Sequence, residues 1–516
     1  MTENYLNILA ETIRNNWDQP ALTDFYLTED GSAQDTSRGN HYTYGEMYEE
    51  LCRVAELLTS LGLQKGDHIA ICGANSAHWV IAYLAIAKMQ GVSVTVMHTL
   101  MPDEIARLIT FSDAKALFTD EDIWTELAPL YRPSLGDLSA VISLADWSIL
   151  RGENLPISNF QSPISNSDCG FPQSAPDDLA MICFTSGSTG TSKGVMLPYS
   201  SLNVNNINNI TCDLIENHRD DSKSFLAVLP FAHMYGMMDN LITHITRGMH
   251  VNIAGGIHTP HKLLSAINII QPYGLAITPA IFDGILTSAR KQDNWFSYLN
   301  YIETGGASLS KETECLAIDK RIPYFSGYGL SELGPHITSS TNMSRKGSCG
   351  KVARYIQCRI SPAGEILVKG ENVMLGYYKD SEATARKIDS DGWLHTGDKG
   401  HLDEDGYLYV EGRLEQDIIV LPNGENIRPD NIESLINALP EVSESIVLAR
   451  DGKLVAIVVP QITNHKSPIT NTDLRRIILR NVNPSLPLFS QLYDVEISDT
   501  PLARTEKQTI KRYLYK

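Results

Sequence analysis

The sequence predicts an α/β protein built from a large N-terminal domain and a small α+β C-terminal domain. Its 516 residues exceed what one hydrophobic core accommodates. Strand-like and helix-like segments alternate up to about residue 340, as in a mainly parallel sheet. From about residue 350 the pattern changes to short strands and turns, and the last hundred or so residues carry a helix–strand pattern of their own.

The first part of the chain predicts two α/β subdomains. In the first subdomain we expect helices at 44–58 and 77–89 and strands at 68–72, 92–97 and 116–119. Residues 151–178 are rich in Ser, Pro and Asn, which is typical of a connector. In the second subdomain we expect strands at 179–184, 225–229, 274–277 and 301–303.

The remainder predicts a small β-rich subdomain and then a separate domain. Strands are expected at 364–369 and 406–411, and Asp405-Gly406 is typical of a hairpin turn. Past a joint near Arg413 we expect helices at 429–439 and 472–482 and strands at 444–449 and 454–459. The predicted domains are therefore residues 1–413 and 414–516.

Composition excludes several classes of protein. The net charge of −19 argues against nucleic acid as the main partner, so anionic ligands need local binding sites. The eight cysteines form no CxxC pair, which favours a reducing compartment over a zinc site or a disulfide framework. The N-terminus lacks the pattern of a signal peptide, and no stretch predicts a membrane span. We expect a cytoplasmic protein.

Residues 185–195, TSGSTGTSKGV, follow a strand-like apolar run and suit a polyphosphate. Glycine lets backbone N–H groups converge on an anion, hydroxyls donate further hydrogen bonds, and Lys193 adds a charge. The stretch is not a Walker A loop, because Ser192 precedes the lysine where that motif has Gly. A solvated turn is the alternative for such a loop in isolation.

Four further segments carry candidate functional groups. His233 follows a predicted strand in LPFAHMYG, and Gly305-Gly306-Ala307 follows another. The segment GYGLSE, residues 327–332, places a carboxylate beside a hydroxyl and two glycines. The segment GWLHTGD ends at Asp398 and precedes Gly412-Arg413.

With these ordered motifs the chain resembles the acyl-adenylate-forming superfamily of AMP-binding enzymes, from about residue 40 to the C-terminus. Residues 370–385 and 421–433 resemble fatty acyl-CoA synthetases most. The resemblance implies an acid–thiol ligase whose small α+β C-terminal domain is mobile. A carboxylate attacks the α-phosphorus of ATP, and a thiol then displaces AMP. The implied cofactors are ATP, Mg²⁺ and coenzyme A or a carrier phosphopantetheine.

The resemblance also implies roles for individual residues. Glu332 would bind Mg²⁺, Asp398 the ribose, Arg413 the ribose or phosphate side, and Tyr328 would stack on adenine. Each residue also has a purely structural alternative: Glu332 could be a solvated loop acid and Asp398 a helix or turn cap. Arg413 could form a surface ion pair, and Tyr328 could pack in the core. The implied catalytic residues are Lys193, Ser331, Glu332 and Lys507. The implied ATP/AMP-binding residues are Thr185, Ser186, Gly187, Ser188, Thr189, Gly190, Gly305, Gly306, Ala307, Tyr328, Gly329, Asp398 and Arg413.

Three further sets follow from position in the family. The acyl pocket is assigned to His233, Met237, Asn240 and His336, with Ala307 beside them. The hinge is assigned to Asp417, although the segment around it departs from the usual pattern. The loop for thioester formation is assigned to Gly424, Glu425 and Asn426.

The C-terminal motif departs from the family. Residues 502–512, LARTEKQTIKR, have Gln508-Thr509 where the family has Gly-Lys. Losing one such donor costs roughly 10²- to 10³-fold in rate. Three interpretations follow: Lys507 or Lys511 replaces the lysine, adenylation is slow, or the chain is a variant favouring the thioester step. We favour Lys507.

We therefore expect ATP-dependent activation of an apolar carboxylic acid, a medium or long fatty acid by resemblance, followed by transfer to CoA. An aryl acid is an alternative substrate. An acyl carrier protein is an alternative acceptor, because a basic cluster of Lys507, Lys511, Arg512 and Lys516 could meet an acidic helix. The third alternative, from a different class, is a non-catalytic acyl-nucleotide binder.

Overall fold

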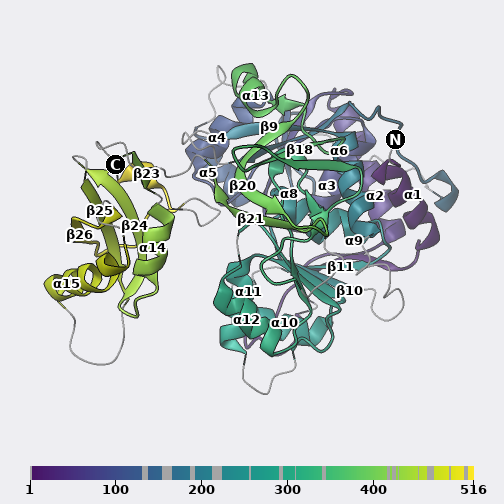
Figure 1. Ribbon diagram of the computed structural model, residues 1–516. Helices are drawn as coiled ribbons and strands as arrows, with labels where there is room; N and C mark the ends of the chain where they lie inside the picture. Colours follow the sequence, from purple (N-terminus) through teal and green to yellow (C-terminus); the bar gives the residue numbers. More distant parts are fainter. Residues whose placement is uncertain are drawn as a thin grey trace. The chain divides into compact units, whose positions relative to one another are not determined.

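The computed structural model describes most of the chain. The described residues are 3–35, 37–130, 138–153, 165–185, 192–211, 224–254, 257, 259–289, 295–307, 309–339, 345–414, 419–420, 426–427, 429–450, 453–461, 470–486, 490–504 and 510–515. They form two compact units, Met1–Gly412 and Arg413–Lys516. Figure 1 shows the elements of each unit.

The larger unit contains a sheet of eight strands in the described part of the chain. Its order is β19-β9-β8-β4-β3-β5-β6-β7, and the five strands from β8 to β6 run parallel. The outer strands β7, β9 and β19 are antiparallel to their neighbours. The strands are β3 His68–Cys72, β4 Val92–Thr95, β5 Ala116–Thr119, β6 Ala140–Ser143, β7 Ile149–Arg151, β8 Leu179–Thr185, β9 Lys193–Pro198 and β19 Gly376–Tyr377.

Two smaller, mainly parallel sheets contain the later strands of the second α/β run, and one of them also includes β1 and β2 from the N-terminal part of the chain. The first has the order β10-β11-β1-β2 and the second the order β12-β13-β14. Their strands are β1 Pro20–Phe25, β2 His41–Thr43, β10 Ser224–Ala227, β11 His250–Ala254, β12 Gly274–Ile277, β13 Tyr301–Thr304 and β14 Tyr324–Ser326. Because β13 and β14 run parallel, the glycines after each strand come to the same edge.

The β-rich part of the larger unit is antiparallel, with the order β17-β18-β20-β21. Its strands, with the β15–β16 pair, are β15 Thr338–Ser339, β16 Lys351–Val352, β17 Ile356–Ile360, β18 Glu365–Gly370, β20 Leu394–Leu402 and β21 Leu408–Arg413. Between β20 and β21, Gly406 has a φ of 81°, a left-handed conformation that glycine adopts without strain. The predicted hairpin glycine therefore occupies the turn.

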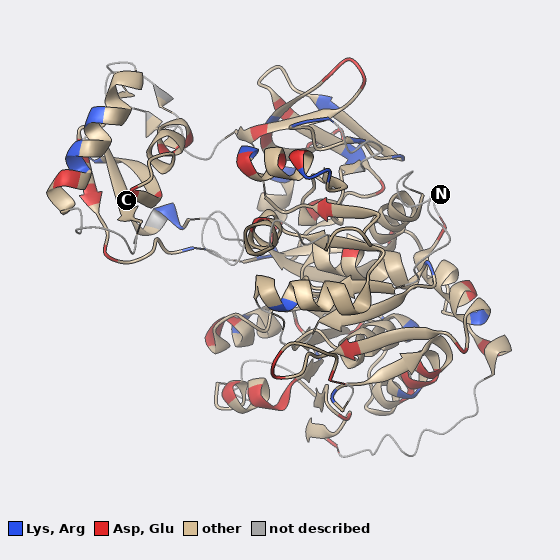
Figure 2. Ribbon diagram, turned by 90° about the horizontal axis from the view of Figure 1, so that it is seen from below, with Lys and Arg blue, Asp and Glu red and all other residues tan. Residues whose placement is uncertain are grey.

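The helices of the larger unit cover these sheets. They are α1 Tyr5–Asn15, α2 Tyr44–Ser60, α3 Ala77–Lys88, α4 Pro102–Phe111, α5 Glu121–Leu127, α6 Tyr199–Ile210, α8 Met234–Gly236, α9 Thr243–Ile245, α10 Pro260–Ile270, α11 Pro279–Ser288, α12 Lys311–Asp319 and α13 Ser381–Lys387. A π-helix, η3 Met237–Ile242, joins α8 to α9, and 3₁₀ turns occur at η2 Asn166–Asp168 and η4 Ser331–Leu333. Figure 2 shows acidic and basic residues intermixed over this unit.

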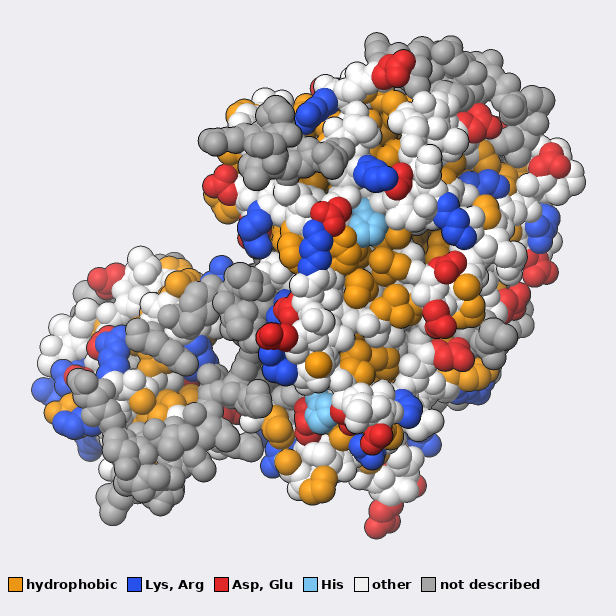
Figure 3. Space-filling model, turned by 90° about the horizontal axis from the view of Figure 1, so that it is seen from above, with side chains coloured by type: hydrophobic (Ala, Val, Ile, Leu, Met, Phe, Trp, Pro, Cys, Tyr) orange, Lys and Arg blue, Asp and Glu red, His pale blue; other side chains and the backbone are white. Residues whose placement is uncertain are grey.

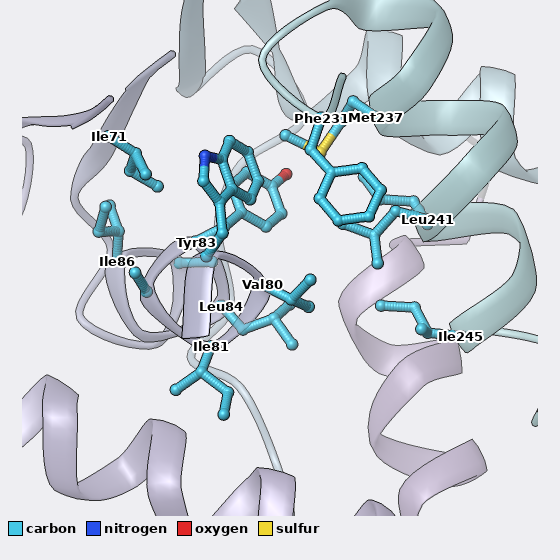
Figure 4. Close-up of a cluster of buried hydrophobic side chains, with 14 of the residues drawn as sticks. Ile71, Val80, Ile81, Tyr83, Leu84, Ile86, Phe231, Met237, Leu241 and Ile245 are labelled. Carbon is cyan, nitrogen blue, oxygen red and sulfur yellow. The ribbon is translucent and has the colours of Figure 1, made fainter. Parts of the chain in front are cut away.

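Helix α3 supplies much of the core because it is apolar on every side. All of its residues except Lys88 are buried. Figure 4 shows Val80, Tyr83 and Leu84 on this helix beside Phe231 and Met237. A helix buried all round is held by packing, since burying each large apolar side chain contributes about 1.5–3 kcal/mol.

The smaller unit packs two helices on a three-stranded sheet of the order β24-β25-β26. Its elements are β22 Ile419–Val420, β23 Asn426–Ile427, α14 Pro429–Asn437, β24 Val442–Arg450, β25 Lys453–Pro460, α15 Asn471–Val482, η5 Asn483–Ser485, β26 Asp494–Ile497 and η7 Arg512–Leu514. The Arg512 guanidinium pairs with the carboxylate of Glu433, and the Val447 N–H donates to the same carboxylate at 2.6 Å. Arg512, one member of the basic cluster named above, is therefore an internal partner of this unit.

The predicted fold class is confirmed, but the strand predicted at 179–184 was assigned to the wrong subdomain, because β8 pairs with β4 in the sheet of the first α/β run. Other differences lie at the ends of elements. The strand predicted at 225–229 ends at Ala227 because the N–H groups of Val228 and Leu229 donate to the Asn240 side chain, at 2.9 and 3.1 Å. The helix predicted at 429–439 ends at Asn437. No helix within the described ranges is both long enough and apolar enough to cross a membrane.

Candidate active site

The ends of the predicted phosphate loop are held by a strand pair. β8 ends at Thr185, β9 begins at Lys193, and these two residues are direct partners in the antiparallel register. The Ser192 hydroxyl donates to a carboxylate oxygen of Glu104 at 3.0 Å. Lys193 is therefore held by the strand pair opposite Thr185, and its binding of phosphate stays a prediction.

Lys193 and Glu332 meet through Tyr377, a residue that the sequence reasoning did not select. The Lys193 Nζ lies 4.8 Å from the centroid of the Tyr377 ring, a cation–π distance. The Tyr377 hydroxyl donates to the Glu332 Oε1 at 2.7 Å. Tyr377 is nearly buried, whereas Lys193 and Glu332 are half-buried. The tyrosine thus joins a cation and a carboxylate that both remain available to a ligand.

Backbone hydrogen bonds bring these three side chains together. The Met374 N–H donates to the Glu332 carbonyl at 2.9 Å, directly before the short strand β19. β19 then pairs with β9 beside Lys193, and the Tyr378 N–H donates to the Gly194 carbonyl at 2.7 Å. Three segments far apart in the sequence therefore converge, which the motifs alone did not reveal.

Ser331 and Gly329 lie in the same segment as Glu332. Ser331 begins the 3₁₀ turn η4 and is buried. Gly329 passes so close to Pro335 that an added Cβ would lie 1.9 Å from the Pro335 carbonyl oxygen. Only glycine fits there, so the approach of these two backbones depends on it.

Tyr328 and Asp398, predicted for the nucleoside, contact each other. The Tyr328 hydroxyl donates to the Asp398 Oδ2 at 2.6 Å. The Asp398 N–H donates to the Thr396 hydroxyl at 3.0 Å, which fixes the backbone of this residue in β20. The pair offers an aromatic face and a carboxylate, groups that suit a base and a ribose.

The glycines after β13 lie against an aromatic ring. A Cβ at Gly305 would lie 3.1 Å from the Tyr235 ring, so a larger side chain would need the ring to move. Gly306 has a φ of 82° and is exposed, as is Ala307. The backbone at Gly306 and Ala307 is therefore accessible, and the binding of adenine there stays a prediction.

Three ionisable side chains, Asp239, Glu303 and His336, form a buried cluster in the larger unit. The His336 Nε2 lies 2.9 Å from each carboxylate oxygen of Asp239, and the Asn209 amide donates to the Asp239 Oδ1 at 2.9 Å. Glu303 is the third member, and the ligand atoms of Asp239, Glu303 and His336 lie within 4.8 Å of one another. This spacing suits either a shared network of charges or a metal ion.

Burial and charge shift the pKa values of this cluster. Burial and, to a smaller extent, the Asp239 carboxylate raise the pKa of Glu303, His336 opposes both effects, and the result is a pKa of about 8. Burial lowers the pKa of His336, but the Asp239 carboxylate outweighs it and brings the pKa to about 9. At neutral pH the favoured state is therefore an imidazolium–carboxylate pair beside a protonated Glu303.

The remaining predicted pocket residues have structural partners. The Met237 side chain is fully buried in the core near Phe231 (Figure 4). The Asn240 amide donates to the Ala276 carbonyl at 3.1 Å, and its oxygen accepts from two backbone N–H groups. The His233 Nδ1 accepts from the Tyr235 N–H at 3.2 Å, which caps α8.

Several predicted site residues lie outside the described part of the chain: Ser186, Gly187, Ser188, Thr189, Gly190, Asp417, Gly424, Glu425 and Lys507. The side chains of Arg413 and Asn426 also lie outside it. The residues that the sequence reasoning missed are Tyr377, Asp239 and Glu303. A single acid within an apolar run, as in GMMDNLI and NYIETGG, is the signal that could have indicated the last two.

The chain belongs to the AMP-binding enzyme family. The model of that family matches residues 9–378, and the model of the AMP-binding enzyme C-terminal domain matches residues 416–515. The class of protein that the fold and the site define is therefore an AMP-binding enzyme of two parts.

Particular relatives agree with that family. The chain is 27% identical to 4-coumarate–CoA ligase 3 of Arabidopsis thaliana, over 93% of this chain and 87% of the relative. The ATP-bound structure of MatB from Rhodopseudomonas palustris is similar at a TM-score of 0.78 and 23% identity, covering 100% of this chain and 98% of that one. MenE from Bacillus subtilis, o-succinylbenzoate CoA synthetase with its acyl-adenylate OSB-AMP, gives 0.78 and 23%, covering 99% and 98%. These structures show the shared fold.

Proposed function

We propose that this enzyme joins a carboxylic acid to coenzyme A in two steps that consume ATP. A carboxylate oxygen attacks the α-phosphorus, the bond between the α- and β-phosphates breaks, and pyrophosphate leaves. The thiolate sulfur of CoA then attacks the acyl carbon, the acyl–oxygen bond to phosphate breaks, and AMP leaves. The thiol proton passes to solvent.

The arrangement of Lys193, Tyr377 and Glu332 carries this proposal. An anion must attack a polyanion, so positioned positive charge supplies most of the rate enhancement. The residues present fit Mg²⁺, because Glu332 offers a half-buried carboxylate beside the base of the phosphate loop. Bound there, Mg²⁺ would supply further charge neutralisation. Lys193 would bind the phosphates, and Tyr377 would orient Glu332.

We propose two classes of carboxylic acid as substrates. Medium or long fatty acids follow from the sequence motifs, and aryl acids gain support from a relative named as a 4-coumarate ligase. Figure 3 shows hydrophobic side chains gathered in the middle of one face of the larger unit, with charged ones around them. CoA is the acceptor we propose over a carrier protein, since Arg512 is engaged with Glu433.

The test is release of pyrophosphate that depends on an added acid. We expect Lys193→Ala and Glu332→Gln each to lower the rate of acyl-AMP formation by roughly 10²- to 10³-fold, because the first removes a cation that would bind the phosphates and the second weakens the site that would hold Mg²⁺. Lys262→Ala, on the exposed side of α10, is the matched control and should retain the full rate. No pyrophosphate release from the unaltered enzyme with a broad panel of acids would refute the proposed reaction.

A further inference from the structure

The buried cluster of Asp239, Glu303 and His336 contains one carboxyl group more than it can pair internally. The Asp239 carboxylate accepts from Asn209 and lies against His336. Among the hydrogen bonds of the described residues, none involves the carboxyl oxygens of Glu303, although this residue is only 8% exposed. The oxygens keep some accessible surface within a mostly buried residue, so a ligand can reach them, and a donor placed there would offset part of the cost of burying the carboxyl group.

Glu303 faces the segments that we assign to the adenylate. One residue, Thr304, separates it from the glycines after β13, and an added Cβ at Gly327 would lie 3.1 Å from the Glu303 Oε1. Gly327 begins the segment that carries Tyr328, Ser331 and Glu332. The Glu303 carboxyl group therefore lies next to the backbone of the segment that we assign to the adenylate.

The charge of the cluster indicates what it would bind. At neutral pH Glu303 keeps its proton, because its ionisation would leave two carboxylates against one imidazolium. A wholly apolar acid would leave that group unpaired in a dry site, and a second anion would be repelled by Asp239. A group that donates a hydrogen bond satisfies Glu303, and an ammonium group would also favour the ionised carboxylate through its own positive charge.

We propose that Glu303, supported by the Asp239–His336 pair, binds a hydrogen-bond-donating group, an amine or a hydroxyl, on the acid substrate at a distance from the carboxylate that reacts. This inference rests on the proposed function and defines its substrate class. Asp239 and His336 are positioning residues, because they act on the ligand through Glu303. The preferred acid is then polar at its far end, in contrast to a simple fatty acid.

Acids of matched length test the proposal in the unaltered enzyme. The probes are hexanoate, 6-aminohexanoate, 6-hydroxyhexanoate and adipate, with 3-phenylpropionate and its 4-amino and 4-hydroxy derivatives as an aromatic set. We expect kcat/KM for pyrophosphate release to be roughly tenfold or more higher for the donor-bearing acids than for their apolar counterparts. The amino and hydroxy arms distinguish the two kinds of donor.

Two variants test whether Glu303 causes the preference for donor-bearing acids. Glu303→Leu should reverse the preference toward hexanoate and 3-phenylpropionate, because an apolar side chain of similar volume replaces the unpaired carboxyl. Glu303→Gln should lower turnover of the amino acids more than that of the hydroxy acids, since the amide still accepts a hydrogen bond but lacks the charge. Glu312→Gln, on the exposed face of α12, should leave every ratio unchanged.

The outcomes separate the two proposals. Equal or better turnover of the apolar acids by the unaltered enzyme overturns this inference and leaves the acid–CoA ligase intact. A metal ion retained in stoichiometric amount and lost in Glu303→Leu also overturns it. Absence of pyrophosphate release with every acid overturns both. If the variants fail to fold, the comparison of acids in the unaltered enzyme still decides.

Discussion

Two regions of the larger unit hold charged side chains in opposite ways. Lys193 and Glu332 are half-buried, and the ring and hydroxyl of Tyr377 link them. Asp239 and His336 are almost completely buried and contact each other directly. A half-exposed charge loses little solvation free energy on folding because water still contacts it. A buried charge loses most of it and is stable only when it has an oppositely charged or hydrogen-bonding partner. The first region is therefore free to exchange ligands, and the second depends on its internal pairing.

Removing one member of the buried pair should have the largest effect on stability. Asp239→Ala should lower the free energy of unfolding by about 3–5 kcal/mol, because it leaves the buried His336 imidazolium without its carboxylate partner and removes one of the acceptors of the Asn209 amide. Glu332→Gln, in the other region, should change it by less than about 0.5 kcal/mol. Urea unfolding at pH 7, followed by circular dichroism, measures both. Similar losses in the two variants would remove the contrast between the regions.

A smaller effect should come from the link between Lys193 and Glu332. Tyr377→Phe keeps the ring near Lys193 and removes only the hydroxyl that donates to Glu332. We expect about a tenfold loss in acyl-AMP formation, since one hydrogen bond to a charged group contributes about 1.5–3 kcal/mol and water replaces part of it. Single-turnover kinetics at saturating ATP measure the loss, with Tyr355→Phe, an exposed tyrosine, as the matched control. An unchanged rate would mean that Glu332 is oriented without Tyr377.

The sequence predicted the fold class and the half-exposed region because both depend on local patterns. Apolar runs separated by turn residues gave strands such as β3 at the residues expected, and the glycine- and hydroxyl-rich loop indicated Lys193. Motif order also selected Glu332. What joins them, the pairing of β19 with β9, is a contact between distant segments that no local pattern specifies.

The buried cluster was only partly predicted for the same physical reason. His336 was selected by its position in the family, but its role depends on Asp239, which lies about a hundred residues earlier in the chain. Asn240 and Met237 were selected with it. The Asn240 side chain hydrogen-bonds to the backbone, and the Met237 side chain packs in the hydrophobic core. Which face of a π-helix points toward a neighbour is decided by packing, and the sequence alone does not show it.

The last effect we predict is a dependence of stability on pH that arises in the buried region. Glu303 has a pKa raised from 4.5 to about 8, and His336 has one raised from 6.5 to about 9. In both cases the folded state binds the proton more tightly than the unfolded state, so stability falls as pH rises. The contribution of Glu303 is lost from about pH 4.5 through 8, and that of His336 from about 6.5 through 9.

Comparison with Glu303→Gln isolates this effect, because all groups outside the cluster titrate equally in both proteins. The groups that face Glu303 are Asp239, His336 and the Tyr235 hydroxyl, which donates to the Glu303 carbonyl at 3.2 Å. Thermal unfolding midpoints between pH 5 and about 9 should fall more steeply in the unaltered protein, and the gap between the two curves should change mainly below pH 8. A gap that is constant with pH would show that Glu303 titrates as it does in water. Other contacts would then stabilise the ionised form of Glu303, and Glu303 and Glu332 would differ in their burial but not in their pKa.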